Sequence, residues 1–196
     1  MRLPQWGGRR KGAGRKPQGP RSLVSHKARP RFEKPAPAHV TLLVAPHVWN
    51  LRSRRCSRAI ETAFAGAHER FGLRLIEYSI LGNHLHLLVE ADSRLALSRG
   101  MQGLGIRMAK ALNRLMRRSG RVFADHYHSR LLRSPSELAA AIRYVLGNHA
   151  HHFGGGDPRD RFSSAALDGR RRELVLSHSR TWLLRAGWRR ARRVPH

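Results

Sequence analysis

The stretch LGNHLHLLVEA, residues 81–91, places two histidines one residue apart inside an apolar run. Side chains alternate between the two faces of a β-strand, so residues two apart share a face and stand about 6.5–7 Å apart along it. His84 and His86 therefore share one face of a predicted strand, while the leucines next to them point into a core. Two imidazoles side by side on a rigid strand can bind a metal ion, exchange protons or simply line a solvated face.

The segments around this strand alternate between strand and helix. Alternating or β-branched apolar residues predict strands at 39–45, 73–81, 84–90 and 121–133, and apolar residues at helical spacing predict helices at 49–72, 95–120 and from 135 onward. This order is typical of an α+β fold: a ferredoxin-like, split βαβ antiparallel four-stranded sheet with helices packed on one face. The histidine strand is central in that plan, and one sheet face is left for a ligand.

The start of the last helix is marked by a capping box. Ser134-Pro135-Ser136-Glu137 combines an N-cap serine, a proline at the first helical position and a glutamate three residues after the cap. We therefore expect the helix to begin at Pro135.

The two ends of the chain differ from the middle in composition. We expect a basic, Gly/Pro-rich flexible arm at 1–36, a folded domain at 37–153 and an Arg-rich tail at 154–196, with both arms disordered or weakly ordered. A length of 196 residues suits one domain with arms better than two domains.

The charge predicts an anionic polymer as partner. There are 39 lysines and arginines against 12 acidic residues, a formal charge of +27, and a basic surface gains free energy by releasing counterions from phosphates. A solvated arm and a solvated helix face are the competing explanations for individual basic residues. The candidate phosphate contacts are Arg9, Arg10, Lys11, Arg15 and Lys16 in the arm, and Arg107, Lys110 and Arg114 in the second helix.

Several classes of protein are disfavoured. Cys56 is the only cysteine, which leaves no disulfide framework and no cysteine-based zinc site. No apolar run approaches the roughly 20 residues of a membrane span, and the N-terminus lacks the apolar core of a secretory signal. We expect a cytoplasmic, nucleoid-associated protein without membrane attachment.

The histidine pair is an incomplete metal site, because a metal ion needs at least one further protein ligand. The last predicted helix offers one, since Tyr144 and Asn148 stand four residues apart and share a helix face. A tyrosine beside a metal-held phosphodiester can act as a covalent nucleophile. The alternative for Tyr144 is a ring that packs at a rim with its hydroxyl in water.

These residues resemble a known family. LGNHLHLLVEA resembles the PNHxHLLV motif of HUH-type single-tyrosine transposases, in particular the REP-associated tyrosine transposase branch. GRVFADHYHSRLLRSPSELAAAIRYVLGN, residues 120–148, resembles the strand and tyrosine helix that follow in that family, and the resemblance extends over residues 37–152. It implies the split βαβ fold and metal-dependent cleavage and rejoining of single-stranded DNA beside a hairpin, through a 5′-phosphotyrosine intermediate.

Carried over by position, the resemblance implies that His84 and His86 bind the metal, Tyr144 is the nucleophile and Asn148 is a third ligand, with Mg²⁺ or Mn²⁺ as cofactor. Gly82 departs from the family's proline before Asn-His, and the Asn-Pro-Val-like segment after the tyrosine is absent. The rival third ligands in its place are His149, His151 and His152. Monomer and homodimer both remain open, since the tyrosine helix could serve its own chain or a partner.

Two other functions fit the same residues. A domesticated, non-catalytic DNA-hairpin-binding protein would keep the fold and the basic surface but form no covalent adduct. A metal-independent RNA phosphoesterase with two His-x-Ser/Thr motifs would use His39-Val40-Thr41, but its second motif needs a hydroxyl where His86 stands. Metal dependence separates this last function from the transposase.

Overall fold

The computed structural model describes residues 31–153 and 160–191, with the side chains of 148–153 left out. A four-stranded sheet in the order β2-β3-β1-β4 lies at its centre, and all neighbouring strands are antiparallel. The strands are β1 (Ala36–Leu43), β2 (Leu73–Ile80), β3 (His84–Ala91) and β4 (His128–Leu131). This is the predicted ferredoxin-like, split βαβ arrangement, so the fold class is confirmed and β3 is a central strand.

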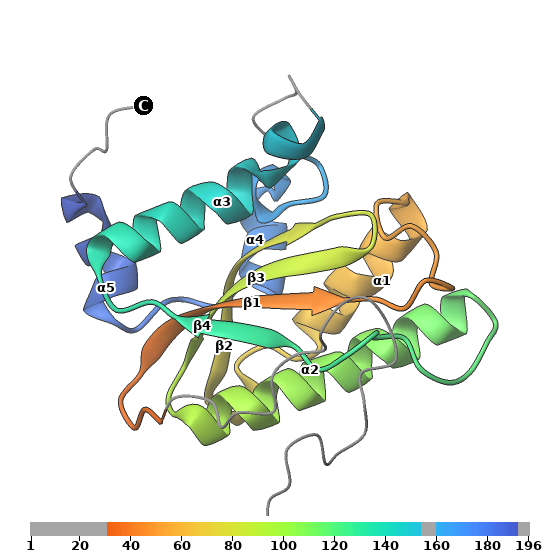
Figure 1. Cartoon of the computed structure of the whole chain (residues 1–196), viewed down its shortest axis with the longest axis horizontal. Helices are drawn as coiled ribbons and strands as arrows, with labels where there is room; N and C mark the ends of the chain where they lie inside the picture. Colours follow the sequence, from red (N-terminus) through yellow and green to blue (C-terminus); the bar gives the residue numbers. More distant parts are fainter. Residues whose placement is uncertain (1–30, 154–159, 192–196) are drawn as a thin grey trace, which may run out of the picture.

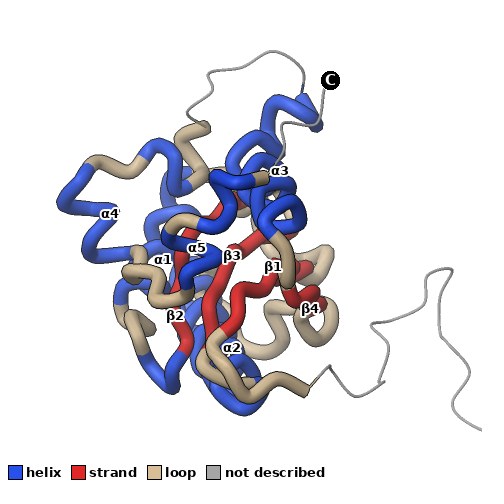
Figure 2. Tube along the Cα trace, turned by 90° about the vertical axis from the view of Figure 1, so that its left-hand side faces the viewer, coloured by secondary structure: helices blue, strands red, loops and turns tan. Residues whose placement is uncertain are grey.

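Helices cover both faces of the sheet (Figures 1 and 2). On one face, α1 (Arg54–Ala65) and α2 (Arg94–Leu115) enclose the main core with the apolar side chains of β1, β2 and β3. On the other face, which we expected to be free, α3 (Pro135–Phe153) covers part of the sheet. No helix among the described residues has the length and apolar character needed to cross a membrane.

The helix starts follow their caps. The hydroxyl of Ser53 accepts a hydrogen bond from the N–H of Cys56, so α1 begins at Arg54, later than the apolar pattern predicts. The Ser134 hydroxyl accepts from the N–H of Glu137 at 3.2 Å, and α3 begins at Pro135 as the capping box predicts.

The fourth strand is much shorter than expected. Only His128–Leu131 pair as β4, because the chain before them instead runs past the end of β1. There Val44 and Phe123 form an isolated bridge, and the N–H of Ala45 donates to the carbonyl of Val122. The alternation expected over 121–133 therefore covers two short pairings separated by a loop.

The C-terminal segment also differs from expectation. We predicted a disordered or weakly ordered tail, but residues 160–191 lie against the domain. They contain η2 (Ser164–Ala166), α4 (Gly169–Val175), α5 (Trp182–Arg185) and η3 (Gly187–Arg190), while η1 (Arg70–Gly72) precedes β2. Phe162 and Ser163 pair with the free edge of β2, and Leu184 joins the small apolar cluster under α3. Apolar residues scattered among the arginines anchor this segment, which composition alone did not reveal.

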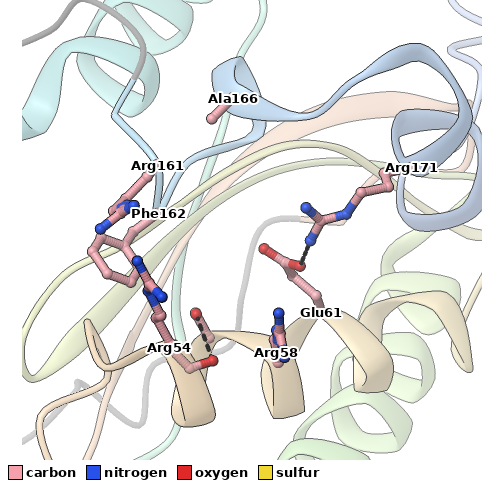
Figure 3. A pocket seen from close by; sticks show the side chains of 8 residues that line it. Arg54, Arg58, Glu61, Arg161, Phe162, Ala166 and Arg171 are labelled. Atoms are coloured by element: carbon pink, nitrogen blue, oxygen red, sulfur yellow. Dashed lines mark hydrogen bonds and ion pairs between the residues drawn. The ribbon is translucent and has the colours of Figure 1, made fainter.

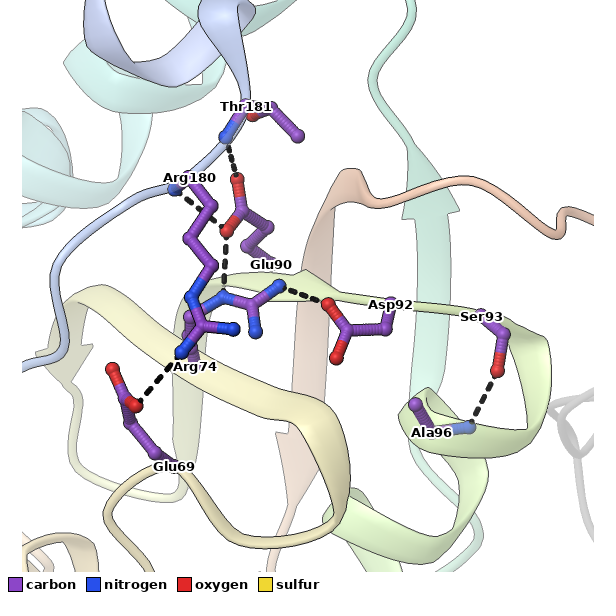
Figure 4. Close-up of polar contacts among 8 residues, drawn as sticks. All are labelled: Glu69, Arg74, Glu90, Asp92, Ser93, Ala96, Arg180 and Thr181. Atoms are coloured by element: carbon purple, nitrogen blue, oxygen red, sulfur yellow. Dashed lines mark hydrogen bonds and ion pairs between the residues drawn. The ribbon is translucent and has the colours of Figure 1, made fainter.

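A buried carboxylate ties the segment to the sheet (Figure 4). Glu90 on β3 is fully buried and forms an ion pair with Arg74 on β2, with 2.7 Å between Oε2 and Nε. The same carboxylate accepts hydrogen bonds from the backbone N–H groups of Arg180 and Thr181. Burial works to raise the pKa of Glu90, but the hydrogen bonds from Thr181, Arg180 and Arg74 hold it below its usual value.

We predict that Glu90→Gln destabilises the protein by about 3–5 kcal/mol, because it leaves Arg74 with a buried, undercompensated charge and faces an amide N–H₂ toward backbone donors. Urea unfolding checks this. Glu69→Gln is the matched control, since Glu69 pairs with Arg180 at the surface and its loss should cost about 1 kcal/mol or less.

The lowered pKa of Glu90 also sets a pH dependence. A depressed carboxylate contributes stability fully above its ordinary pKa, and that contribution is lost as the pH falls through the lower value of the folded state. The gap in stability between wild type and Glu90→Gln should therefore narrow in acid. A gap that stays constant down to strongly acidic pH would contradict this role for Glu90.

Candidate active site

The two histidines of β3 lie together on the face that carries α3. Their ring centroids are 4.9 Å apart and the ring planes are nearly perpendicular, at 87°. His86 is only 4% exposed, whereas His84 is half-buried at the start of the strand, with Nδ1 2.8 Å from Oδ1 of Asn83. The alternation of the strand thus places them as the sequence predicts, with Leu85 and Leu87 in the main core on the opposite face.

The helix α3 brings Tyr144 to this pair. The hydroxyl oxygen of Tyr144 lies 3.4 Å from Nε2 of His86, and the two ring centroids are 4.9 Å apart. The helix is held in place because Leu138 and Ala141 pack against Leu88, which is the next outward-facing residue of β3 after His86. Tyr144 is 40% exposed, so part of this residue is open to solvent while its hydroxyl lies against His86. The tyrosine approaches the histidines of its own chain.

Two further residues reach His86 from β1. Thr41 is the direct cross-strand partner of His86, and its hydroxyl oxygen lies 3.2 Å from Nδ1. His39, two residues earlier on the same face, places Nε2 3.1 Å from that same nitrogen. We had connected His39 and Thr41 only with the phosphoesterase motif. Their two-residue spacing was the available signal, but the register of β1 against β3 was needed to place them beside His86.

The contacts at Nδ1 of His86 can be made by either tautomer, and one of the two suits a ligand role. If Nδ1 carries the proton, it donates to Nε2 of His39 or to the hydroxyl of Thr41, and Nε2 keeps its lone pair. That lone pair faces the hydroxyl of Tyr144. A histidine held in this way through one nitrogen presents the other to a metal ion or to a phenol.

The electrostatics keep His39 neutral. Burial disfavours its charged form, and the positive charges of His128 and Arg130 on β4 act in the same direction, so the pKa of His39 is lowered. On β4, which pairs with β1, His128 is the cross-strand partner of Thr41, and Arg130 is the cross-strand partner of His39. A neutral His39 with its proton on Nδ1 can accept a hydrogen bond from Nδ1–H of His86, whereas a charged His39 has no lone pair to accept one.

The donor set suits a divalent cation in part. Two imidazoles on one strand face are suitable ligands, but no group of three His, Cys, Asp or Glu side chains that could hold a metal ion occurs in the described part of the chain. The third ligand we predicted, Asn148, and its rivals His149, His151 and His152 lie on α3, with side chains outside the described residues. Their backbone places them one to two turns beyond Tyr144, on the helix that crosses the histidines.

Of the predicted phosphate contacts, only those on α2 lie within the described residues. Arg9, Arg10, Lys11, Arg15 and Lys16 lie outside the described residues. Arg107, Lys110 and Arg114 belong to α2, whose apolar side chains pack against the opposite face of the sheet. Any contact they make with DNA is on the far side from Tyr144.

We predict that His39 titrates below the ordinary histidine pKa of about 6.5 in metal-free protein. NMR of the imidazole resonances, assigned with His39→Asn, measures this value. Because the folded state then binds fewer protons than the unfolded state, His39 makes stability rise with pH through the range between its two pKa values. Arg130→Gln should raise the pKa of His39 part of the way, since burial remains. An ordinary pKa in wild type would contradict the description of a buried, neutral His39.

Comparisons with known proteins identify a family for more than half of the chain. The family model described as "Transposase IS200 like" matches residues 37–148, which is more than half of the chain. No curated protein sequence matches. Among solved structures, a REP-associated tyrosine transposase bound to a REP hairpin superposes with a TM-score of 0.62 at 12% identity, covering 80% of this chain and 93% of that one. A putative transposase from Deinococcus radiodurans gives a TM-score of 0.43 at 12% identity, over 65% and 97% of the two chains.

The family match spans β1 to the tyrosine helix, and so includes both histidines and Tyr144. The structural similarity at 12% identity shows the shared fold. The chain belongs to the family of IS200-like transposases.

Proposed function

We propose that this protein cleaves and rejoins single-stranded DNA next to a hairpin, with Tyr144 as the nucleophile. The observation that carries the proposal is the 3.4 Å approach of the Tyr144 hydroxyl to Nε2 of His86, at an accessible position in a member of a transposase family.

In the proposed reaction the hydroxyl oxygen of Tyr144 attacks the phosphorus of a phosphodiester. A bond forms between that oxygen and phosphorus, the bond from phosphorus to the 3′ oxygen breaks, and a free 3′ hydroxyl leaves. The 5′ phosphate stays attached to Tyr144. Attack by a 3′ hydroxyl on the same phosphorus rejoins the strand, breaks the bond from phosphorus to the tyrosine oxygen and returns a protonated Tyr144. The hydroxyl of Tyr144 must lose its proton in the first step. Because the lone pair of His86 Nε2 is assigned to the metal below, the proton passes to a water molecule at the exposed side of the tyrosine.

We assign Mg²⁺ or Mn²⁺ to this site, with His84, His86 and Asn148 as ligands. When bound, the ion would polarise the phosphate and offset the charge that develops on it. His39 and Thr41 would hold His86 by Nδ1, so that Nε2 keeps the orientation that binding requires. The metal and Asn148 are part of the proposal, supported by the imidazole pair and the position of α3.

The substrate is proposed from charge and family. A formal charge of +27 favours a phosphate polymer. The structure that shares this fold is a tyrosine transposase bound to a REP hairpin, which makes a DNA hairpin with single-stranded flanks the first substrate to test. Such a protein would act on chromosomal DNA, which agrees with the expected nucleoid association. Because Tyr144 approaches the histidines of its own chain, a monomer would be sufficient for cleavage.

A second function is favoured by one observation. His39 and Thr41, the first half of a two-histidine phosphoesterase pattern, lie in the same cluster as His84 and His86. An enzyme of that kind would cleave RNA without a metal ion and without a covalent intermediate. The two functions therefore differ in whether cleavage needs a metal ion and in whether a covalent protein–DNA adduct forms.

We predict that wild-type protein forms a covalent adduct with a labelled DNA hairpin carrying single-stranded flanks, in the presence of Mn²⁺, and that Tyr144→Phe forms none. The phenylalanine variant lacks the attacking oxygen but keeps the ring, so DNA binding should change by less than about threefold. Denaturing gels measure the adduct, and sequences flanking the gene together with a pooled hairpin library supply the DNA. Tyr127→Phe is the matched control and should form the adduct as wild type does.

An adduct that persists in Tyr144→Phe would contradict the assignment of the nucleophile. Tight hairpin binding without any adduct would favour the non-catalytic hairpin-binding protein. Metal-independent cleavage of RNA without an adduct would favour the phosphoesterase. His84→Ala with His86→Ala should abolish the adduct, since both imidazoles are assigned to the metal.

A further inference from the structure

An arginine-lined cleft opens between α1 and the C-terminal segment, outside the tyrosine site. Its volume is about 260 Å³. Figure 3 shows Arg54, Arg161 and the ring of Phe162 on one side of it, and the pair of Arg171 and Glu61 on the other. The full lining consists of Arg54, Ser57, Arg58, Glu61, Arg161, Phe162, Ala166 and Arg171.

The cleft carries excess positive charge. Its one carboxylate, Glu61, is already engaged, because it accepts hydrogen bonds from the hydroxyl of Tyr78 and from Arg171. No carboxylate among the described residues pairs with Arg54, Arg58 or Arg161. Three guanidinium groups gathered around a concave surface repel one another, and an anion that enters the cleft removes that repulsion.

The walls of the cleft are held in position. Asp160 forms a two-fold ion pair with Arg52, whose guanidinium lies 4.5 Å above the ring of Phe162. Phe162 and Ser163 in turn pair with the edge of β2. On the other side, Ser53 caps the first turn of α1, from which Arg54 and Arg58 project. The arginines therefore extend from fixed backbone rather than from a loose tail.

The cleft lies close to the tyrosine site along one row of the sheet. His86 pairs with Ser79 on β2, and Ser79 pairs with Ser163, next to Phe162. Two inter-strand steps of about 4.8 Å place this wall of the cleft about 10 Å from the backbone of His86. Arg54 and Arg58 belong to α1, on the sheet face opposite Tyr144. A strand of DNA that leaves Tyr144 would therefore pass around residues 160–163 at the edge of β2 to reach them.

We propose that this cleft binds the phosphates of the single-stranded DNA next to the segment held at Tyr144. The ligand class is a phosphodiester backbone, since guanidinium groups bind phosphate oxygens through paired N–H donors and the contacts need no base sequence. The inference rests on the proposed function, to which it adds a second DNA-binding site built by residues 160–171 and α1.

The test measures binding of a fluorescent DNA hairpin with single-stranded flanks, in EDTA so that no cleavage occurs, over a range of salt concentrations. The triple variant Arg54→Ala, Arg58→Ala and Arg161→Ala should weaken binding. Each single-strand phosphate contact contributes about 0.7 to the slope of log K against log salt concentration, so the loss of three contacts should reduce the magnitude of that slope by about two. The charge-matched control replaces Arg70, Arg94 and Arg99 with alanine. These arginines are exposed at the opposite end of the sheet, so the control should leave the salt dependence of binding nearly unchanged.

Binding of the same hairpin without its flanks shows whether the cleft contacts the single-stranded flank or the double-stranded stem. We expect the cleft variant to bind it as wild type does, because the arginines are assigned to the flanking strand. An equal loss for both DNAs, an equal effect of the two triple variants, or no change in the slope would each overturn the inference. These outcomes are independent of the adduct formed by Tyr144, so the cleft and the catalytic proposal can fail separately.

Discussion

The outward-facing side chains of β3 are the constraint on which the rest of the site depends. The strand is central, so its other face must supply leucine and valine to the main core. That requirement fixes the register, because a shift by one residue would exchange the two faces. The outward row then reads His84, His86, Leu88 and Glu90, and each pair of neighbours in it has a different task.

His84 and His86 in this row belong to the candidate active site, whereas Leu88 and Glu90 hold other segments in place. Leu88 packs against the apolar side chains of α3. This packing positions the helix so that Tyr144 contacts His86, the preceding residue on the same face of β3. Glu90 holds the backbone of residues 180–181 and so fastens the C-terminal segment, whose earlier part forms one wall of the arginine cleft. The tyrosine site and the cleft are thus positioned from the same strand, although one lies over its face and the other beyond the edge of β2.

Much of this could be predicted from the sequence. The alternation in LGNHLHLLVEA correctly predicted a central strand with two histidines on one face, and the order of elements predicted the sheet. The capping box correctly predicted the start of the tyrosine helix. These features are local, since they depend on strand period, helix capping and turn residues within a few positions.

The remainder depends on contacts between distant segments. His39 and Thr41 reach His86 only because of the register between β1 and β3, which a strand pattern alone does not specify. A glutamate near a strand end carries no local sign of burial, yet Arg74 and the C-terminal segment bury Glu90 completely. The arginines of that segment looked like a charged tail because the few apolar residues that fix it, such as Leu184, are widely spaced.

The proposed function requires the histidine pair and Tyr144 to form one metal-dependent DNA-cleaving centre. The most direct measurement is anomalous diffraction at the manganese edge, from crystals of Tyr144→Phe with Mn²⁺ and a DNA hairpin bearing single-stranded flanks. We expect a manganese peak at coordination distance from the imidazoles of both His84 and His86, with a phosphate of the flanking strand beside residue 144. DNA bound elsewhere, or manganese absent from this pair while DNA occupies the face under α3, would contradict it.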